Sequence, residues 1–169
     1  MSKLIGYDYG SSYNTFQTTT TATTTNTTLT TMGSLIVPDN TFQVGQAVRC
    51  TAGFDKVNNN NGYDIRFYWN TTPDLSGSPV LFGVVSATTT TASYYGFQRN
   101  IIINTNSGSN NAFCYSVSTT TLITDLNPIA AAISTVTIDF TTTGYVVFAA
   151  RVLSSSDTMN FRWGKLSNG

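Results

Sequence analysis

The sequence contains no histidine and no glutamate, and only 9% of its 169 residues are charged. Histidine is the commonest general base and metal ligand in proteins, so its absence excludes Ser-His-Asp and Cys-His catalysis. Zinc sites need clustered cysteine and histidine, whereas this chain has only Cys50 and Cys114. Two cysteines are too few for a disulfide framework, and we expect both to be buried thiols that form no disulfide.

The chain also lacks excess charge of either sign, because its net charge is zero. Without a basic stripe there is nothing to bind phosphates, so we expect no nucleic-acid partner. The first six residues lack the apolar run of a signal peptide, and no stretch approaches the roughly 20 apolar residues of a membrane span. We therefore expect no membrane partner.

All eight acidic residues are aspartates. Two carboxylates facing one cleft would be enough for a glycosidase, and spacing along the chain does not exclude such a pair. The aspartates fall mainly at turns, however, where aspartate caps bends. The asparagine run between Asp55 and Asp64 comes closest to a calcium loop, yet it lacks the alternating ligand spacing and is more simply the end of a hairpin. We predict no enzyme activity, no cofactor and no metal site.

The abundant threonine, serine and asparagine disfavour helix interiors, whereas threonine suits a half-exposed strand. Short β-branched or aromatic runs alternate with turn residues, which is typical of a sandwich or barrel. The sequence predicts an all-β fold, an antiparallel jelly-roll-like β-sandwich over residues 32–169. Only residues 129–133 suit a helical turn. The expected strands are 34–37, 46–54, 63–71, 80–85, 94–103, 112–119, 136–140, 145–153 and 159–166.

Three of these strands carry large apolar residues two positions apart, which places them on one face. We expect these residues in the core: Ile65, Phe67 and Trp69; Val136, Ile138 and Phe140; Met159, Phe161 and Trp163. Segment 136–140 should pair with 145–153 across the turn at 141–144. The two tryptophans would otherwise be sugar-stacking platforms. Arg99, inside a strand, should have either a partner on another strand or chain, or a solvated edge position.

Residues 1–31 differ from the rest, because aromatic residues precede a threonine-rich tract that has no core pattern. Such a tract buries too little apolar surface to fold alone. We interpret it as an extended N-terminal arm that anchors the chain to another protein, the alternative being an unstructured tail. The expected anchoring residues are Leu4, Ile5, Tyr7, Tyr9, Tyr13 and Phe16.

Three segments carry a resemblance to a known family. Residues 65–81 (IRFYWNTTPDLSGSPVL) contain a strand that ends in an Asn-Thr pair and a Leu-Ser-Gly loop. Together with 38–46 (PDNTFQVGQ) and with 133–140 leading into 145–148, they resemble small jelly-roll virion proteins of tailed bacteriophages, over about residues 32–166.

The resemblance implies a virion structural protein, commonly a homotrimer, displayed on a capsid or tail and assembled in the host cytoplasm. Its partners would be other virion proteins, gripped by the N-terminal arm. Because no long shaft follows the domain, a capsid decoration protein or head fibre is favoured over a long tail fibre. The alternative is a carbohydrate- or receptor-binding module at a tail-fibre tip, with Tyr68, Tyr94 and Tyr95 contacting host glycans.

Overall fold

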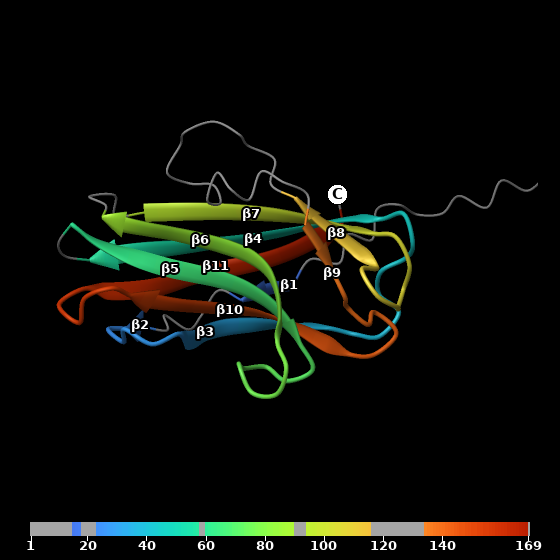
Figure 1. The fold of residues 1–169 in the computed structure, drawn as a ribbon, viewed down its shortest axis with the longest axis horizontal. Helices are drawn as coiled ribbons and strands as arrows, with labels where there is room; N and C mark the ends of the chain where they lie inside the picture. The colour runs from blue at the N-terminus through green and yellow to red at the C-terminus, as the bar shows by residue number, and fades with distance from the viewer. Residues whose placement is uncertain (1–14, 18–22, 58–59, 90–93, 116–133, 169) are drawn as a thin grey trace, which may run out of the picture.

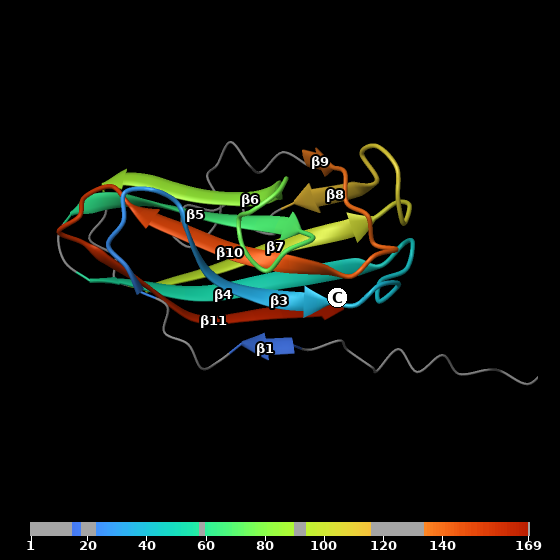
Figure 2. The same cartoon turned by 90° about the horizontal axis from the view of Figure 1, so that it is seen from below.

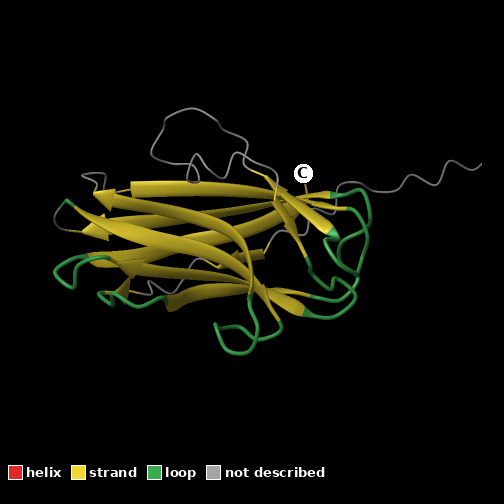
Figure 3. Cartoon of the chain, viewed as in Figure 1, coloured by secondary structure: helices red, strands yellow, loops and turns green. Residues whose placement is uncertain are grey.

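The computed structural model describes residues 15–17, 23–57, 60–89, 94–115 and 134–168. These residues form strands and loops without a helix (Figure 3). The strands are β1 (Thr15–Gln17), β2 (Thr23–Thr24), β3 (Thr30–Val37), β4 (Ala47–Val57), β5 (Asn61–Asn70), β6 (Val80–Thr89), β7 (Tyr94–Ile103), β8 (Ala112–Tyr115), β9 (Ser134–Val136), β10 (Gly144–Val152) and β11 (Thr158–Asn168). The all-β prediction is confirmed.

The strands form two antiparallel sheets that pack face to face (Figures 1 and 2). The seven-stranded sheet has the order β1-β11-β4-β7-β8-β9, with β2 also beside β11, and the four-stranded sheet has the order β3-β10-β5-β6. The chain crosses from one sheet to the other at most connections, whereas consecutive strands pair as neighbours in β5–β6, β7–β8 and β8–β9. This is the predicted antiparallel β-sandwich.

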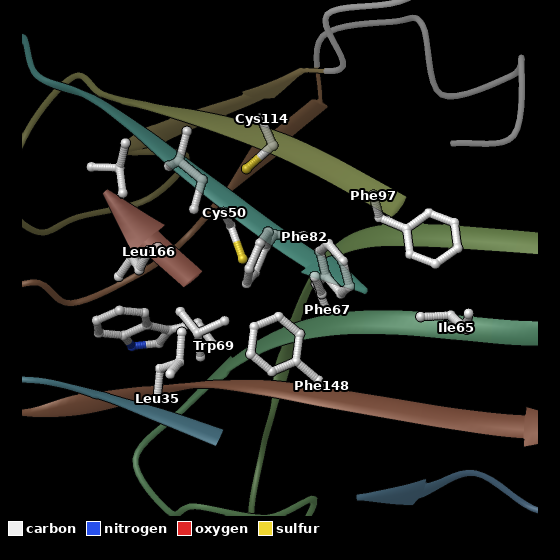
Figure 4. Close-up of a cluster of buried hydrophobic side chains, with 14 of the residues drawn as sticks. Leu35, Cys50, Ile65, Phe67, Trp69, Phe82, Phe97, Cys114, Phe148 and Leu166 are labelled. Carbon is white, nitrogen blue, oxygen red and sulfur yellow. The ribbon is translucent and has the colours of Figure 1, made fainter. Parts of the chain in front are cut away.

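Aromatic rings from both sheets form the core between them. Phe67 of β5 lies 5.3 Å from Phe148 and 6.1 Å from Phe82 within its own sheet, and 6.4 Å from Phe97 of the opposite sheet, measured between ring centroids. Figure 4 shows these rings together with Trp69. Tilted and edge-to-face pairs of this kind add about 0.5–1.5 kcal/mol each beyond the apolar area that they bury. The predicted core positions of β5 are confirmed, because Ile65, Phe67 and Trp69 are buried.

The prediction that segment 136–140 pairs with 145–153 is wrong. β9 pairs with β8 in the seven-stranded sheet, whereas β10 lies between β3 and β5 in the four-stranded sheet. The physical reason is that residues after β9 bond to the loop before β8: the Ile138 N–H donates to the Asn111 side chain at 2.8 Å, and the Phe140 N–H donates to the Asn106 carbonyl at 3.0 Å. Val136, Ile138 and Phe140 are nevertheless buried, as expected.

Part of the predicted arm lies against the sandwich. β1 pairs with residues 164–166 of β11, and β2 pairs with Met159 and Asn160 of the same strand. Thr24 is buried, and β3 begins at Thr30, so the sandwich takes in residues that precede position 32. Leu4, Ile5, Tyr7, Tyr9 and Tyr13 lie outside the described residues, as does the predicted helical turn at 129–133.

Candidate binding surfaces

The aspartates of the described residues have structural partners. Asp8 and Asp125 fall outside this part of the chain, which leaves six of the eight. The partners are Thr143 for Asp39, Arg162 for Asp55, Arg66 and Arg151 for Asp64, Ser76 for Asp74, Thr141 for Asp139 and Lys56 for Asp157.

Asp74 and Asp139 stabilise turns. The hydroxyl and N–H of Ser76, then the Thr72 hydroxyl, donate to Asp74 and hold the pKa of its carboxyl below the ordinary value. Asp139 accepts from the Thr141 hydroxyl at 2.6 Å and from its N–H at 2.9 Å, and these bonds lower its pKa in the same way. Both carboxylates therefore act as turn caps, as the sequence predicts.

The outer face of the four-stranded sheet holds a charged depression of about 590 Å³. Asp64, which is buried, accepts from Arg66 at 2.8 Å and lies 3.2 Å from a guanidinium nitrogen of Arg151. The hydrogen bonds to Asp64, and a weaker one to Tyr68, raise the pKa of Arg66 further above its ordinary value. Two guanidinium groups thus share one carboxylate. The lining residues are Tyr63, Asp64, Arg66, Val84, Ser86, Ala87, Thr88, Arg151 and Leu153.

Beyond this depression the same face becomes apolar. Ile36 of edge strand β3 is 46% exposed and Leu81 of edge strand β6 is 39% exposed. Each lies opposite a half-buried tyrosine, because Ile36 pairs with Tyr145 and Leu81 pairs with Tyr68. We call these four residues the apolar stripe.

The predicted glycan contacts fall in different sheets. Tyr68 is half-buried in β5, and its hydroxyl lies 3.5 Å from Arg66 Nη1. Tyr94 and Tyr95 begin β7 in the seven-stranded sheet, opposite Asp55 and Phe54. Any glycan contact by Tyr68 would therefore be separate from one by Tyr94 or Tyr95. Phe16, the described member of the predicted anchoring set, pairs with Lys165 of β11.

Trp163 is not in the core, so that prediction is wrong. It is 39% exposed, whereas Met159 and Phe161 of the same strand are buried. The pairing of β11 with β4 is irregular at this point: Phe161 lies opposite Phe54 and Trp163 lies opposite the next residue, Gly53, so Arg162 is an extra residue. Such a bulge reverses which face the following side chains occupy. Trp163 therefore lies on the outer face of the seven-stranded sheet, whereas Trp69 is a core residue as expected.

The indole of Trp163 lies flat on Gly53. A Cβ built on Gly53 would lie 2.2 Å from the indole Nε1, 2.6 Å from Cε2 and 2.8 Å from Cδ1. Because the two carbons bonded to Nε1 are almost as close as Nε1 itself, the ring's face, and not its edge, covers this position. Only glycine leaves room for that approach. The opposite face of the ring accounts for the exposed surface of Trp163.

Charged groups flank Trp163 on its N-terminal side. Arg162 donates to both oxygens of Asp55, and the Asn160 amide donates to the same carboxylate at 3.0 Å. Burial alone would raise the pKa of Asp55, but the hydrogen bonds from Arg162 and Asn160 outweigh it and hold that pKa below the ordinary value. Asp55 is therefore a fixed anion in a neutralised cluster.

Arg99 connects the two sheets. It is buried in β7, and its Nε donates to the Phe82 carbonyl of β6 at 2.9 Å. Of the two interpretations of this residue, the solvated edge position is wrong, and a partner on another strand is confirmed. Cys50 and Cys114 are likewise buried and form no disulfide, as expected.

The described residues contain no group of three or more histidine, cysteine, aspartate or glutamate side chains placed to hold a metal ion. Nor, in the same part of the chain, is there a helix long and apolar enough to cross a membrane. A scan against protein-family models, a search of curated proteins and a search of solved structures found no match to this chain.

Proposed function

We propose that this chain is a non-catalytic structural protein of a bacteriophage particle, most simply a capsid decoration or head-fibre protein. The proposal starts from the resemblance of residues 38–46, 65–81 and 133–148 to small jelly-roll virion proteins. The observation that supports it best is the use of the described aspartates. All six stabilise turns or take part in ion pairs, as expected of a structural protein. In an active site, some of these carboxylates would instead face the substrate.

Self-association is the second part of the proposal. The apolar stripe joins the two edge strands of the four-stranded sheet, β3 and β6, and exposed sheet edges favour pairing with another chain. Burying Ile36 and Leu81 between copies would remove their apolar surface from water at about 25 cal/mol per Å². A closed, symmetric oligomer, for which we propose a trimer, would hide this surface in every copy.

The N-terminal residues supply the attachment to the particle in this proposal. β1 and β2 pair with β11 at one edge of the seven-stranded sheet, whereas the apolar stripe lies on the outer face of the four-stranded sheet. One edge would therefore bind the particle while the four-stranded sheet binds other copies.

Two measurements test the proposal together. Mass spectrometry of gradient-purified phage particles should detect the chain at a stoichiometry that is constant between preparations, and native mass measurement of the purified protein should give a trimer. Deleting residues 1–14 should abolish incorporation and leave both the trimer and its melting temperature unchanged. That deletion is preferable to removal of residues 1–31, which would take away β2 and the start of β3.

A matched variant separates the two surfaces. Leu81→Lys places a charge in the apolar stripe and should yield monomers, whereas Val57→Lys changes another exposed apolar residue, outside the stripe, and should leave the trimer intact. Absence of the chain from purified particles would refute the virion assignment. A wild-type monomer would refute the self-association.

A further inference from the structure

We propose that the outer face of the seven-stranded sheet around Trp163 is a saccharide-binding site. In this site the exposed face of the indole stacks on a pyranose ring, and the bare backbone at Gly96 leaves room for the same or the adjoining sugar. The inference does not depend on the proposed virion role, since it concerns the opposite sheet from the apolar stripe and is tested by a different measurement.

The first observation is the β-bulge at Arg162, which places Trp163 on the outer face of the sheet. Regular pairing of β11 would have kept Trp163 on the core side with Met159 and Phe161; the extra residue at Arg162 reverses it. Bulges are over-represented where a strand re-aims a side chain beside a functional site. A large aromatic side chain left 39% exposed by such a bulge is exposed apolar surface that the fold itself does not use.

The second observation is the geometry of the ring. Because its pyrrole part lies face-down on Gly53, the indole is held parallel to the sheet, with one face to the protein and the other to solvent. A ring fixed in that way has little side-chain freedom left to lose when a ligand stacks on it. Its free face is apolar and carries the negative side of the ring quadrupole. It suits the weakly positive C–H groups on the face of a sugar ring.

The third observation is Gly96, which lies directly opposite Gly53 in β7. Trp163 explains Gly53, but nothing in the described structure explains Gly96: its φ is not in the left-handed region, and a Cβ built on it would meet no atom within 4 Å. Glycine weakens the interior of a strand, and where no turn or packing requires it, it marks a place where a ligand approaches the backbone. Trp163, Gly53 and Gly96 lie in one row across β11, β4 and β7. The open space above Gly96 therefore lies next to the indole ring of Trp163.

Groups that bond to hydroxyls lie in the rows on both sides of this one. On one side are Asp55 and Arg162, an acceptor and a donor fixed to each other. On the other side Thr51 of β4 pairs with Gln98 of β7, and both are half-buried. A sugar hydroxyl both donates and accepts hydrogen bonds, so it can bond to the donors and to the acceptors in these two rows. A purely apolar ligand would leave these polar groups desolvated. The chemistry therefore favours a saccharide.

The first test measures whether solvent reaches the indole ring of Trp163. Trp69 is buried in the core, so collisional quenching of the native protein by acrylamide should affect about half of the tryptophan emission, that of Trp163. Trp163→Phe should remove this quenchable fraction. If native emission is not quenched, another part of the chain or a second copy covers the ring, and the proposal is overturned.

Binding is then measured with labelled full-length protein on an array of bacterial surface polysaccharides and of plant and animal oligosaccharides. The best-bound free oligosaccharide is titrated while tryptophan fluorescence is followed. We expect saturable binding that Trp163→Ala weakens about tenfold or more, from loss of the stacking face and its buried area. Trp163→Tyr, which keeps an aromatic face, should recover part of it. Val44→Ala, which changes an exposed apolar residue outside both proposed surfaces, should bind as the wild type does.

Gly96→Val gives a variant whose folding is not in question. Valine suits a strand better than glycine, and its Cβ enters open space, so the melting temperature should stay the same or rise while saccharide binding is lost. If Gly96 had only a structural role, Gly96→Val should lower the melting temperature and leave saccharide binding unchanged. The proposal fails if no saccharide on the array binds the wild type, if binding survives Trp163→Ala, or if Gly96→Val binds normally. None of these outcomes bears on whether the chain is found in purified particles.

Discussion

The Lys56 ammonium lies 2.9 Å from a carboxylate oxygen of Asp157, and both side chains are enclosed, at 2% and 0% exposure. Lys56 is on the core side of β4, and Asp157 lies in the turn between β10 and β11, where its N–H donates to the Ser154 carbonyl at 3.0 Å. Removing one partner of a buried pair leaves an uncompensated charge. We expect Lys56→Met to lower the free energy of unfolding by about 3–5 kcal/mol, measured by urea denaturation.

A control in the same strand is Arg49→Met, because Arg49 is exposed; the expected loss is below about 1 kcal/mol. The double variant Lys56→Met with Asp157→Leu removes both charges and should regain most of the stability lost in Lys56→Met. The interpretation is wrong if Lys56→Met loses no more than Arg49→Met.

Thiol reactivity follows from the burial of the two cysteines. Burial raises the pKa of the Cys114 thiol to about 12, and burial, together with the neighbouring Cys114, raises that of Cys50 still further. Since the thiolate is the nucleophile, neither residue should react with a disulfide reagent in the native protein at neutral pH, and both should react in concentrated guanidinium. Counting released chromophore checks this. Rapid modification of native protein would show that the core opens around Cys50 and Cys114 (Figure 4).

Asn111 connects the loop after β7 to the segment after β9. Its buried amide donates to the Ile138 carbonyl at 2.6 Å and to the Thr105 carbonyl at 2.8 Å, and its side-chain oxygen accepts from the Ile138 N–H. Asn111→Ala leaves these backbone groups unsatisfied, at about 1–3 kcal/mol for each buried group, so we expect a loss of several kcal/mol in thermal or urea unfolding. Asn104→Ala, at an exposed position of the same loop, is the control and should change stability little. Equal losses would contradict the role given to Asn111.

The sequence predicts local strand structure well here and strand partners poorly. The sequence predicts a strand over residues 94–103, and β7 has the same bounds, because β-branched and aromatic runs between turn residues are a local signal. The partner of residues 136–140 depends on contacts far away in the chain. Residues 133–153 contain no sequence signal for the hydrogen bonds that Ile138 and Phe140 make to the loop at 104–111. The local sequence therefore predicts a hairpin with the next strand, which needs only a short turn.

The sequence offers Trp163 as a sugar-stacking residue only as the alternative to a core position, for a related reason. Alternation along β11 predicts Trp163 in the core, and a bulge of one residue is invisible to a pattern with period two. The signals that were available are Gly53 and Gly96, single glycines inside two predicted strands without a turn to explain them. Their meaning appears only once the register places them side by side, opposite Trp163.

Acid sensitivity is expected from Asp55, whose pKa in the folded protein lies below its ordinary value because Arg162 and Asn160 donate to its carboxylate. A carboxyl with a lowered folded-state pKa adds stability above its unfolded pKa, about 3.9, and that contribution is lost as the pH falls through the lower folded-state value. Asp55→Asn should therefore be less stable than the wild type at neutral pH, by about 1–2 kcal/mol for the lost charge-assisted hydrogen bonds, and the two should converge in acid. Urea denaturation across this range measures the difference, and Arg162→Gln, which removes the cation, should reduce the same acid-sensitive contribution. A difference between Asp55→Asn and wild type that does not change with pH would mean that the shape of the Asp55 side chain, and not its charge, stabilises this part of the sheet.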